Sequence, residues 1–420
     1  MHRLLFYMSL LLIVSQNKLV GISLPKSAYD LSVVGEIWFA ESIARLPILL
    51  IDMLKDDIKL NFIPTSNSVR FEDVPPQVQK IVTHKDKTPG AVSLLLTLPG
   101  NNTRSSKSTA YQHVPKESPI RIAYLMFEAD PMPPLWIPIL NNEFDAVAVP
   151  DIFCKELFIK NGVKIPVFIL PHGIYLEDFL KKPVRVTPSK PFRFGVSASF
   201  TFRKNLDLIL EAFAKEFGNN QEVHLTLHGR SGSSKSLQER VKQLNLTNVT
   251  IINQTFTHKE YVDFIASQDC YVLLSRGEGF SVSIREALGA GVPPIVSDNS
   301  AHTTVCKTGF VRAVPTESTI NVLYPDFGYY SATMWNASFD DACAALREVY
   351  EQYPIYKNKA LQGREWVKRY LIENLKPYYL SLIKPKRILL GKHNCITKDY
   401  LMTNSQALYN KYRTLQTRYS

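Results

Sequence analysis

Two glutamates with a short spacing are the first residues in this sequence that could do chemistry. Glu278 and Glu286 belong to the segment SRGEGFSVSIRE at 275–286, which follows an apolar run at 270–274. Glu278 lies in a glycine-flanked loop, and Glu286 lies in the first turns of an expected helix. A helix N-terminus favours anionic ligands, and a carboxylate beside it can accept hydrogen bonds from two hydroxyls of a ribose or hexose. The competing interpretations are a capping box of Ser283 and Glu286 and a solvated loop carboxylate at Glu278.

A basic pair, Arg203 and Lys204, stands between an expected strand at 192–196 and an expected helix at 206–217. The guanidinium group of arginine offers two parallel donors and lysine offers a point charge, so the pair suits a diphosphate. The competing interpretation is an exposed basic turn without a ligand.

Parallel α/β units are needed to position these segments. The sequence predicts a strand at 19–24, a loop at 25–35, an amphipathic helix at 36–45 and a strand at 48–51, which is the pattern of a parallel sheet. Further buried strands are expected at 92–98, 120–127, 145–149 and 167–170, and a loop at 101–118.

A Pro- and Lys-rich seam at 177–191 precedes a second series of the same kind. Its expected strands are 192–196, 223–227, 249–252, 270–274 and 294–296, and its expected helices are 206–217, 237–244, 258–267, 284–289, 339–353 and 360–371. Two consecutive open α/β domains predict a cleft between them, because ligands bind outside the carboxyl ends of such strands. The expected division of the chain is 1–18, a hydrophobic N-terminal segment; 19–176 and 177–370, two Rossmann-like domains; and 371–420, a helix and basic tail.

With both motifs in one α/β domain, the sequence resembles family 4 of the retaining glycosyltransferases, which have the GT-B fold. The family's pattern of two glutamates separated by seven residues is matched by Glu278 and Glu286 in RGEGFSVSIREALGAGVPPIVSD. The resemblance implies that Glu278 and the amides of Gly279, Phe280 and Ser281 hold the donor sugar and its phosphate. Glu286 would hold the ribose, and Arg203 and Lys204 would neutralise the departing diphosphate. It implies neither a metal nor another cofactor.

The resemblance extends upstream and covers about residues 19–370. Residues 122–128 (IAYLMFE) followed by DPMPPLW, and the element PHGI at 171–174, are similar to family segments on the acceptor side. The candidates there are Glu128, which either contacts acceptor hydroxyls or fixes the following loop, and His172, which either packs at the domain crossover or takes part in catalysis. Gly35 stands alone in the first-strand loop, where a glycine pair is common in the family.

Two further departures from the family pattern concern the donor side. Ser281 stands where many members have glycine. The stretch VSASF at 196–200 replaces a common Gly-Arg, so Arg203 and Lys204 would carry the diphosphate alone.

Composition and charge limit the remaining options. With 45% hydrophobic and 21% charged residues and a mean hydropathy of −0.08, the chain is neither disordered nor a multi-span membrane protein. The net charge of +11 is concentrated in two stretches, 181–204 and 381–420, each with a surplus of seven basic residues. Neither stretch interleaves aromatic stacking motifs in the way of nucleic-acid binders, apart from the tyrosines of the tail. A basic tail of this kind suits an anionic membrane.

The N-terminus leaves the compartment open. His2 and Arg3 precede an apolar run from Leu4 to Val14, which resembles the core of a signal peptide and is short for a membrane span. A signal or anchor and an extra buried segment are equal alternatives. We therefore expect membrane association, on the cytoplasmic face or in a secretory lumen. The five separated cysteines, without a CxxC pair, predict no zinc site or disulfide framework.

The expected function is transfer of a sugar from a nucleotide sugar to an acceptor hydroxyl of a glycan, glycolipid or lipid-linked saccharide, with retention of configuration. Two alternatives are an idle protein that only binds nucleotide sugars and another GT-B enzyme, such as a sugar-nucleotide epimerase. A dehydrogenase is disfavoured because no GxGxxG follows the first strand. The donor sugar, nucleotide base, acceptor and linkage depend on loop shapes that a sequence does not specify.

Overall fold

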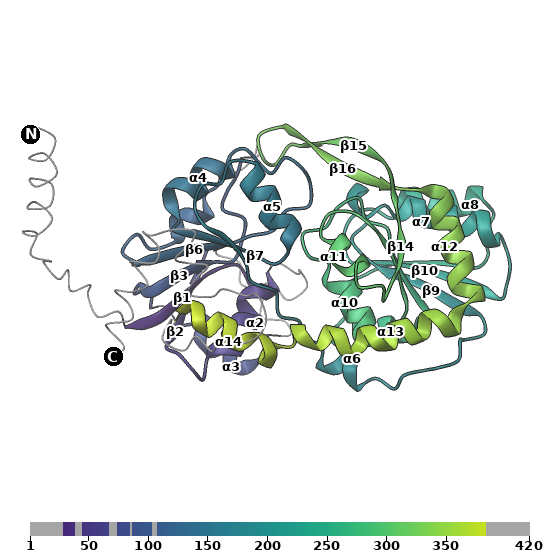
Figure 1. Ribbon diagram of the computed structural model, residues 1–420, viewed down its shortest axis with the longest axis horizontal. Coiled ribbons are helices and arrows are strands. Elements are labelled where there is room, and N and C mark those ends of the chain that lie inside the picture. The colour runs from purple at the N-terminus through teal and green to yellow at the C-terminus, as the bar shows by residue number, and fades with distance from the viewer. Residues whose placement is uncertain (1–27, 38–43, 67–73, 85, 103–106, 384–420) are drawn as a thin grey trace, which may run out of the picture.

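The computed structural model describes residues 28–37, 44–66, 74–84, 86–102 and 107–383 of the chain. It has two α/β lobes lying side by side (Figure 1). Each lobe is built on a six-stranded parallel sheet, with the orders β2-β1-β3-β6-β7-β8 and β11-β10-β9-β12-β13-β14. The predicted pair of open α/β domains is therefore confirmed.

The strands of the first sheet are β1 (Tyr29–Gly35), β2 (Leu60–Pro64), β3 (Gly90–Leu95), β6 (Ile120–Tyr124), β7 (Ala146–Val149) and β8 (Val167–Ile169). Those of the second are β9 (Phe192–Ser197), β10 (Val223–Gly229), β11 (Val249–Asn253), β12 (Cys270–Leu273), β13 (Pro294–Ser297) and β14 (Arg312–Val314). Two antiparallel pairs are added: β4 (Asn101–Asn102) with β5 (Lys107–Ser108), inside the expected loop at 101–118, and β15 (Thr316–Tyr324) with β16 (Tyr330–Ala337).

The helices of the first domain are α2 (Arg45–Leu54), α3 (Pro76–Val82), α4 (Trp136–Glu143), α5 (Ile152–Lys160) and the 3-10 turn η1 (Ala110–His113). The second series comprises α6 (Glu177–Lys181), η2 (Phe202–Lys204), α7 (Leu206–Phe217), α8 (Lys235–Gln243), α9 (His258–Ser267), α10 (Val282–Gly289), α11 (His302–Cys306), α12 (Phe339–Glu351), α13 (Tyr353–Val367) and η3 (Lys368–Tyr370). The last described helix is α14 (Ile372–Ile383).

The start of the first domain differs from the prediction. The strand expected at 19–24 lies outside the described residues. Residues 29–35, expected to be part of a loop, form β1, which pairs with β2 and β3. The strand was not predicted because polar residues interrupt its apolar pattern. One of them, Ser32, is fully buried, and its hydroxyl donates to Asn61 Oδ1 (2.8 Å) and accepts from the Gly90 amide (2.8 Å).

The strand expected at 48–51 is also wrong, because these residues lie inside α2. Ile48 to Ile51 are all buried, and α2 packs against α3 and α14. A helix buried on most of its surface has the same unbroken apolar run as a buried strand, so the pattern alone does not separate them. Of the amphipathic helix expected at 36–45, residues 38–43 lie outside the described part of the chain.

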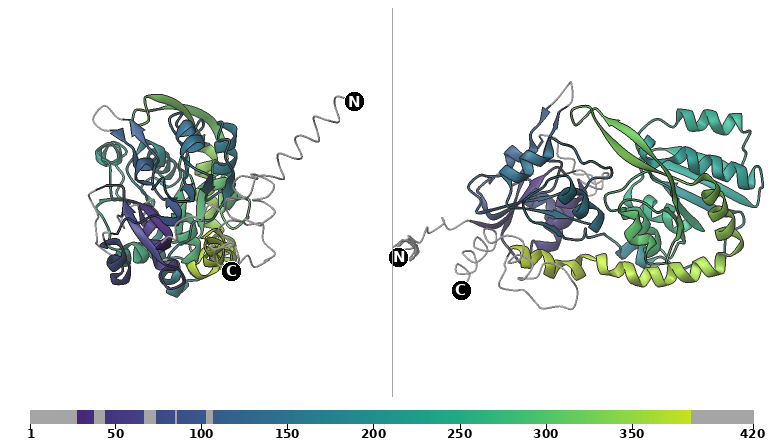
Figure 2. Two further views of the ribbon diagram at one scale, coloured as in Figure 1. Left: turned by 90° about the vertical axis from the view of Figure 1, so that its left-hand side faces the viewer. Right: turned by 45° about the horizontal axis from the view of Figure 1, so that its top comes forward.

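The β15–β16 hairpin was not predicted, and it joins the two domains. It follows the second sheet in sequence, yet Ala332 and Met334 belong to a core cluster of the first domain. The backbones of Asp130 and Thr333 exchange two hydrogen bonds, of 3.1 and 2.7 Å. Figures 1 and 2 show the hairpin reaching from one lobe to the other.

Helix α14 makes a second return to the first domain. From α13 the chain runs along one edge of the molecule into α14 (Figure 1), where Leu375, Tyr379 and Leu382 join the core around β1 and α2. The Tyr379 hydroxyl donates to the Pro171 carbonyl (2.9 Å). The first domain therefore includes a helix from the far end of the described chain.

Replacing Leu375 by alanine tests this packing. Because Leu375 is 3% exposed, we expect Leu375→Ala to lower the free energy of unfolding by about 2–5 kcal/mol. The matched control is Glu373→Ala on the exposed face of α14, with an expected change within about 0.5 kcal/mol. Urea denaturation measures both, and equal losses would contradict the assigned packing.

Candidate active site

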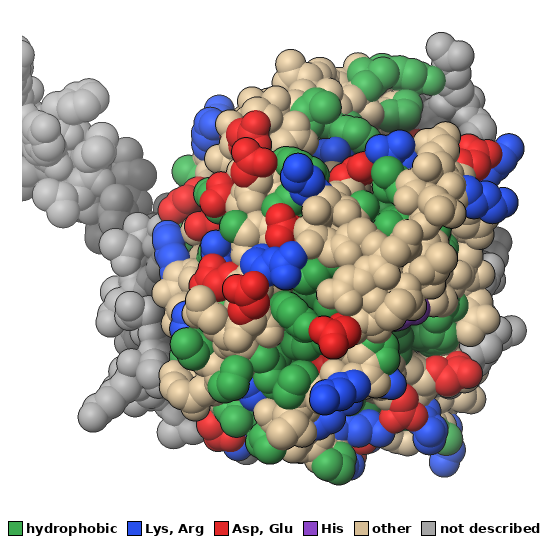
Figure 3. All heavy atoms as spheres, turned by 90° about the vertical axis from the view of Figure 1, so that its right-hand side faces the viewer, with side chains coloured by type: hydrophobic (Ala, Val, Ile, Leu, Met, Phe, Trp, Pro, Cys, Tyr) green, Lys and Arg blue, Asp and Glu red, His purple; other side chains and the backbone are tan. Residues whose placement is uncertain are grey.

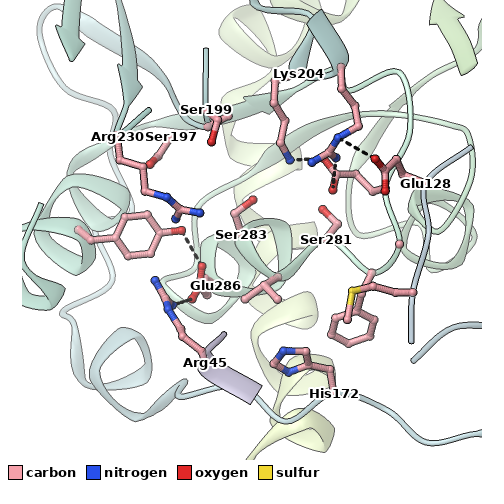
Figure 4. Close-up of a pocket in the computed structure, with 18 of the residues that line it drawn as sticks. Arg45, Glu128, His172, Ser197, Ser199, Lys204, Arg230, Ser281, Ser283 and Glu286 are labelled. Carbon is pink, nitrogen blue, oxygen red and sulfur yellow. Dashed lines mark hydrogen bonds and ion pairs between the residues drawn. The ribbon is translucent and has the colours of Figure 1, made fainter. Parts of the chain in front are cut away.

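A cavity of about 550 Å³ lies between the two domains, at the carboxyl ends of their strands. The first domain contributes residues after β6 and from the PHGI element, and the second contributes residues after β9 and β12 (Figure 4). These are the strand ends where ligands of open parallel sheets bind. The sequence-predicted residues lining it are Glu128, His172, Arg203, Lys204, Glu278, Gly279, Phe280, Ser281 and Glu286.

The basic pair and the first glutamate form one cluster. Arg203 Nη1 lies 3.0 Å from Glu278 Oε2, and Lys204 Nζ contacts Glu278 Oε1. Burial opposes ionisation of Glu278, but the charges of Arg203 and Lys204 outweigh it and hold the pKa of this carboxyl well below its usual range. Burial and then the charge of Arg203 lower the pKa of Lys204. The Glu278 side chain is only 9% exposed, so neither a solvated carboxylate nor an exposed basic turn describes these residues.

Arg203 also reaches the first domain. Its Nε lies 3.6 Å from Glu128 Oε1, to which the Tyr324 hydroxyl of β15 donates at 3.4 Å. Burial disfavours the charge on Arg203, but Glu278 and then Glu128 raise its pKa. Glu128 is therefore placed where the two domains meet, within reach of a molecule entering the cavity from the acceptor side.

The second glutamate, Glu286, contacts side chains of two other helices. Helix α10 begins at Val282 with no side-chain cap, so the alternative of a Ser283–Glu286 capping box is wrong. Instead, the Tyr261 hydroxyl donates to Glu286 Oε2 (2.6 Å), and Arg45 Nη1 lies 3.9 Å from Oε1 (Figure 4). Burial raises the pKa of Glu286 despite these partners.

The loop between the glutamates is pressed against the first domain. A Cβ on Gly277 would lie 2.1 Å from the Glu128 carbonyl oxygen, and one on Gly279 would lie 2.8 Å from Met126 Cβ. Glycine alone therefore permits this approach. It keeps the donor-side loop and the acceptor-side strand end in contact.

Ser281 closes this loop in an unusual conformation. Its φ is +65°, in the left-handed region, and its Oγ lies 2.8 Å from Nε2 of the fully buried His302. The other ring nitrogen of His302 faces Ser297, 3.1 Å from its Oγ and 3.2 Å from its carbonyl oxygen. Burial lowers the pKa of His302 to about 4, although Glu278 acts in the opposite direction.

The remaining acceptor-side candidates are placed differently. His172 lines the cavity and stacks on Phe280, with ring centroids 5.6 Å apart. Gly35 ends β1, where a Cβ would meet Pro47 at 3.1 Å and the Leu96 carbonyl at 3.3 Å. Gly35 is not among the residues that line the cavity.

Sequence reasoning missed several residues that line or support the cavity: Arg45, Tyr261, His302, Tyr324 and Phe327. They belong to no motif, and their neighbours are distant in sequence. The hairpin carrying Tyr324 and Phe327 did have a signal, because β-branched and aromatic residues are frequent along 316–324 and the turn residues Pro, Asp and Gly follow at 325–328. In the described part of the chain, no group of His, Cys, Asp and Glu side chains is arranged to hold a metal ion.

The basic stretch at 181–204 does not form one anion-binding patch. Several of its charges have acidic partners: Lys181 with Asp178, Lys182 with Asp263, Arg185 with Asp269 and the Arg203–Lys204 pair with Glu278. On the outer face of the second domain, basic and acidic side chains are interspersed (Figure 3). The stretch therefore provides charge to the cavity chiefly through Arg203 and Lys204.

The buried His302 predicts a pH-dependent stability. The unfolded chain takes up the proton near pH 6.5, whereas the folded chain takes it up only near pH 4. The free energy of unfolding therefore falls as the pH falls through this window, by roughly 3 kcal/mol from this group. The His302→Gln variant should lack this part of the pH-dependent loss of unfolding free energy. Urea denaturation of both proteins at pH 7.5 and 4.5 measures the difference, and parallel curves would contradict it.

Comparison with known proteins agrees with this arrangement. Residues 179–320 match the family model described as Glycosyl transferases group 1. Alpha-monoglucosyldiacylglycerol synthase of Streptococcus pneumoniae is 22% identical over 38% of this chain and 38% of its own length. A protein named probable sucrose-phosphate synthase of Thermosipho melanesiensis is 20% identical over 54% of this chain and 49% of its own length. The chain thus spans less than half of each relative.

Solved structures resemble a larger part of the chain. Anabaena HepE in complex with UDP and glucose has a TM-score of 0.61 at 11% identity, covering 84% of this chain and 99% of that one. Sucrose-phosphate synthase of Thermosynechococcus elongatus has a TM-score of 0.59 at 13% identity, covering 84% and 98%. Residues 179–320 of the second domain thus match the group 1 glycosyltransferase model, and the two domains together have the fold of these solved structures, which is the GT-B fold that the sequence predicted.

Proposed function

We propose that the protein transfers a sugar from a nucleotide sugar to an acceptor hydroxyl, with retention of the anomeric configuration. The observation that carries the proposal is the Arg203–Lys204 pair, which Glu278 of the loop before α10 holds inside the interdomain cavity. Further support comes from the family match of residues 179–320. Structural relatives solved in complex with UDP and with UDP-glucose make a uridine nucleotide the first donor to try.

In this proposal the donor spans the second-domain side of the cavity. Its diphosphate lies against Arg203, Lys204 and the N-terminus of α10, where backbone N–H groups and the helix dipole add positive potential. Its ribose hydroxyls donate to Glu286, and the transferred sugar lies beside Glu278. Both carboxylates already accept from donors of the protein, so hydroxyls of the donor would replace or share these bonds.

The chemical step depends on charge stabilisation. As the bond from the anomeric carbon to the phosphate oxygen breaks, negative charge grows on the diphosphate, and Arg203 and Lys204 stabilise it at no cost of reorientation. The acceptor hydroxyl attacks from the same face and gives its proton to the leaving phosphate, which preserves the configuration. Glu128 would orient the acceptor hydroxyl. We propose that the two cations make a metal ion unnecessary.

A lipid-linked or glycolipid acceptor is part of the proposal. One relative is named as a glycolipid synthase, and the basic tail suits an anionic membrane at ~1 kcal/mol per basic residue near the surface. The tail beyond Ile383 and the N-terminal segment lie outside the described residues. None of the helices that the structure describes is long and apolar enough to cross a bilayer.

Neutralising either cation tests the chemical role. We expect Arg203→Met and Lys204→Met each to lower kcat about 100-fold, as removal of one transition-state donor does elsewhere. The matched control is Lys215→Met, on the exposed side of α7, with unchanged kcat. Turnover of UDP-glucose, UDP-galactose and UDP-N-acetylglucosamine with glycan and glycolipid acceptors is the measurement, with and without EDTA.

The outcomes separate the alternatives. An idle binding protein would bind a nucleotide sugar without turnover in wild type or in Glu286→Ala. An epimerase would invert a sugar centre without an acceptor. Loss of turnover in EDTA, restored by a divalent metal, would contradict the metal-independent mechanism.

The configuration of the product tests retention. A donor with an α-linked sugar should yield an α-linked product, because attack and departure occur on one face. The proton coupling constant at the anomeric centre, measured by NMR at early times, reports it. A β-linked product would exclude the proposed geometry.

Deletion of residues 384–420 tests the membrane role of the tail. We expect binding to vesicles containing phosphatidylglycerol to weaken at least tenfold, since these residues include the entire basic surplus at 381–420. Vesicles of phosphatidylcholine alone are the control. Unchanged binding to the anionic vesicles would refute this role.

A further inference from the structure

A buried chain of hydrogen bonds ends at the cavity and has no role in the steps above. It runs from Ser275 through Ser297 and His302 to Ser281. His302 is completely buried, whereas Ser281 lines the cavity. Figure 4 shows the Ser281 side chain among the labelled residues that surround the cavity. The chain therefore links the protein interior to one hydroxyl group at the ligand site.

The direction of each hydrogen bond follows from the partners. The Ser297 hydroxyl donates to the Ser275 carbonyl at 2.8 Å, so its oxygen can only accept from His302. The second neighbour of the same nitrogen, the Ser297 carbonyl, is also only an acceptor. A neutral imidazole has one N–H, which must therefore be on Nδ1, leaving a lone pair on Nε2. Nε2 then accepts the hydroxyl proton of Ser281.

This arrangement makes the Ser281 oxygen a hydrogen-bond acceptor toward the cavity. Its hydrogen is committed to His302, so the oxygen offers only lone pairs to a molecule in the cavity. Lone pairs attract a hydroxyl donor, whereas a phosphate oxygen at the same place would meet another acceptor. The side chain therefore suits a sugar hydroxyl, although the neighbouring helix start suits a phosphate.

The backbone of Ser281 is held in place at a conformational cost. A φ of +65° is unfavourable for serine and common for glycine. Arg285, fully buried, donates from Nη1 to the carbonyls of Phe280 and Ser281, and its guanidinium lies 3.8 Å from the centre of the Phe280 ring. Strain of this kind persists where the surroundings over-determine it, and it concentrates at functional sites.

We propose that Ser281 Oγ determines donor specificity by accepting a hydrogen bond from one hydroxyl of the transferred sugar, and that His302 is the positioning residue that sets its direction. The proposal rests on the proposed function, because it assumes a nucleotide sugar in this cavity. It adds a side-chain contact to a loop whose family-implied contacts were backbone amides and Glu278.

Substitution by glycine is the clean test, because glycine keeps the left-handed backbone and removes only the hydroxyl. The probes are UDP, UDP-glucose and the four monodeoxyfluoro analogues of UDP-glucose, in which one hydroxyl donor at a time is lost. With wild type, we expect one analogue to bind about tenfold more weakly than UDP-glucose, the usual effect of one uncharged hydrogen bond. With Ser281→Gly, UDP-glucose itself should weaken about tenfold, that analogue should weaken no further, and UDP should bind as before.

The matched control is Asn245→Gly. Asn245 also has a left-handed φ, of +51°, and it lies outside the cavity. This variant changes the backbone in the same way and should leave all affinities unchanged. If it alters them as Ser281→Gly does, the effect belongs to the backbone and the proposal fails.

His302→Phe tests the positioning role. The phenyl ring is aromatic like imidazole but offers no acceptor, so the Ser281 hydroxyl is free to rotate. We expect this variant to bind UDP-glucose and the analogue that wild type binds weakly with equal affinity. The affinity for UDP should stay within twofold of wild type, a pattern that a general loss of structure would not produce. If His302→Phe does not fold, Ser281→Gly still decides the specificity role.

The results distinguish the two levels of the proposal. If wild type binds none of the nucleotides, both the proposed function and this inference fail. If it binds UDP-glucose but Ser281→Gly weakens UDP equally, the hydroxyl serves the phosphate and the inference alone fails. If no analogue shows coupling to Ser281, a sugar contact at this side chain is excluded.

Discussion

Two mostly buried positive charges in the cavity between the domains are the constraint on which the rest of this structure depends. Removing charge from water is costly unless opposite charges and hydrogen bonds compensate. Arg203 and Lys204 obtain this compensation from Glu278 of their own domain and from Glu128 of the other. Because one partner lies across the cleft, the electrostatic centre is complete only when the domains are assembled.

The backbone around this centre is correspondingly tightly constrained. Asn205, Ser281 and Ser300, three of the residues other than glycine with positive φ, belong to the loops beside the cluster. The Glu278 amide donates to Ser300 Oγ (2.8 Å), and Asn205 Nδ2 donates to the Leu274 carbonyl (3.2 Å). The loops are thus braced against one another, which keeps the charged side chains at fixed positions before any ligand arrives.

Much of the second domain could be predicted from sequence, and the reasons are local. Helices α7 and α9 have the predicted bounds, because amphipathic spacing marks both and a capping box of Thr257 and Glu260 starts α9. The motif residues converge because they follow strands whose carboxyl ends share one edge. The start of the first domain was harder to predict. Helix α2 is too buried to show a polar face, and β1 contains polar residues that find their hydrogen-bond partners only after folding.

The unpredicted part of the site depends on contacts between distant segments. Arg45 meets Glu286, and Tyr324 meets Glu128, only because the domains and the hairpin come together. His302 belongs to no sequence motif. Its significance comes from two neighbours, Ser281 and Ser297, which lie on different loops. Local pattern therefore identified the ligand-facing charges, while tertiary structure determined what surrounds them.

The path of the chain has a consequence for synthesis on the ribosome. All six strands of the first sheet have been made once residue 169 has emerged, but the hydrophobic cores on its two faces are still incomplete. One core awaits Ala332 and Met334 of the hairpin, and the other awaits Leu375, Tyr379 and Leu382 of α14. The domain made first must therefore leave apolar surface exposed until the second domain has been translated. Its core is filled only when α14, the last helix of the described residues, has been made, and the two domains acquire their final structure together.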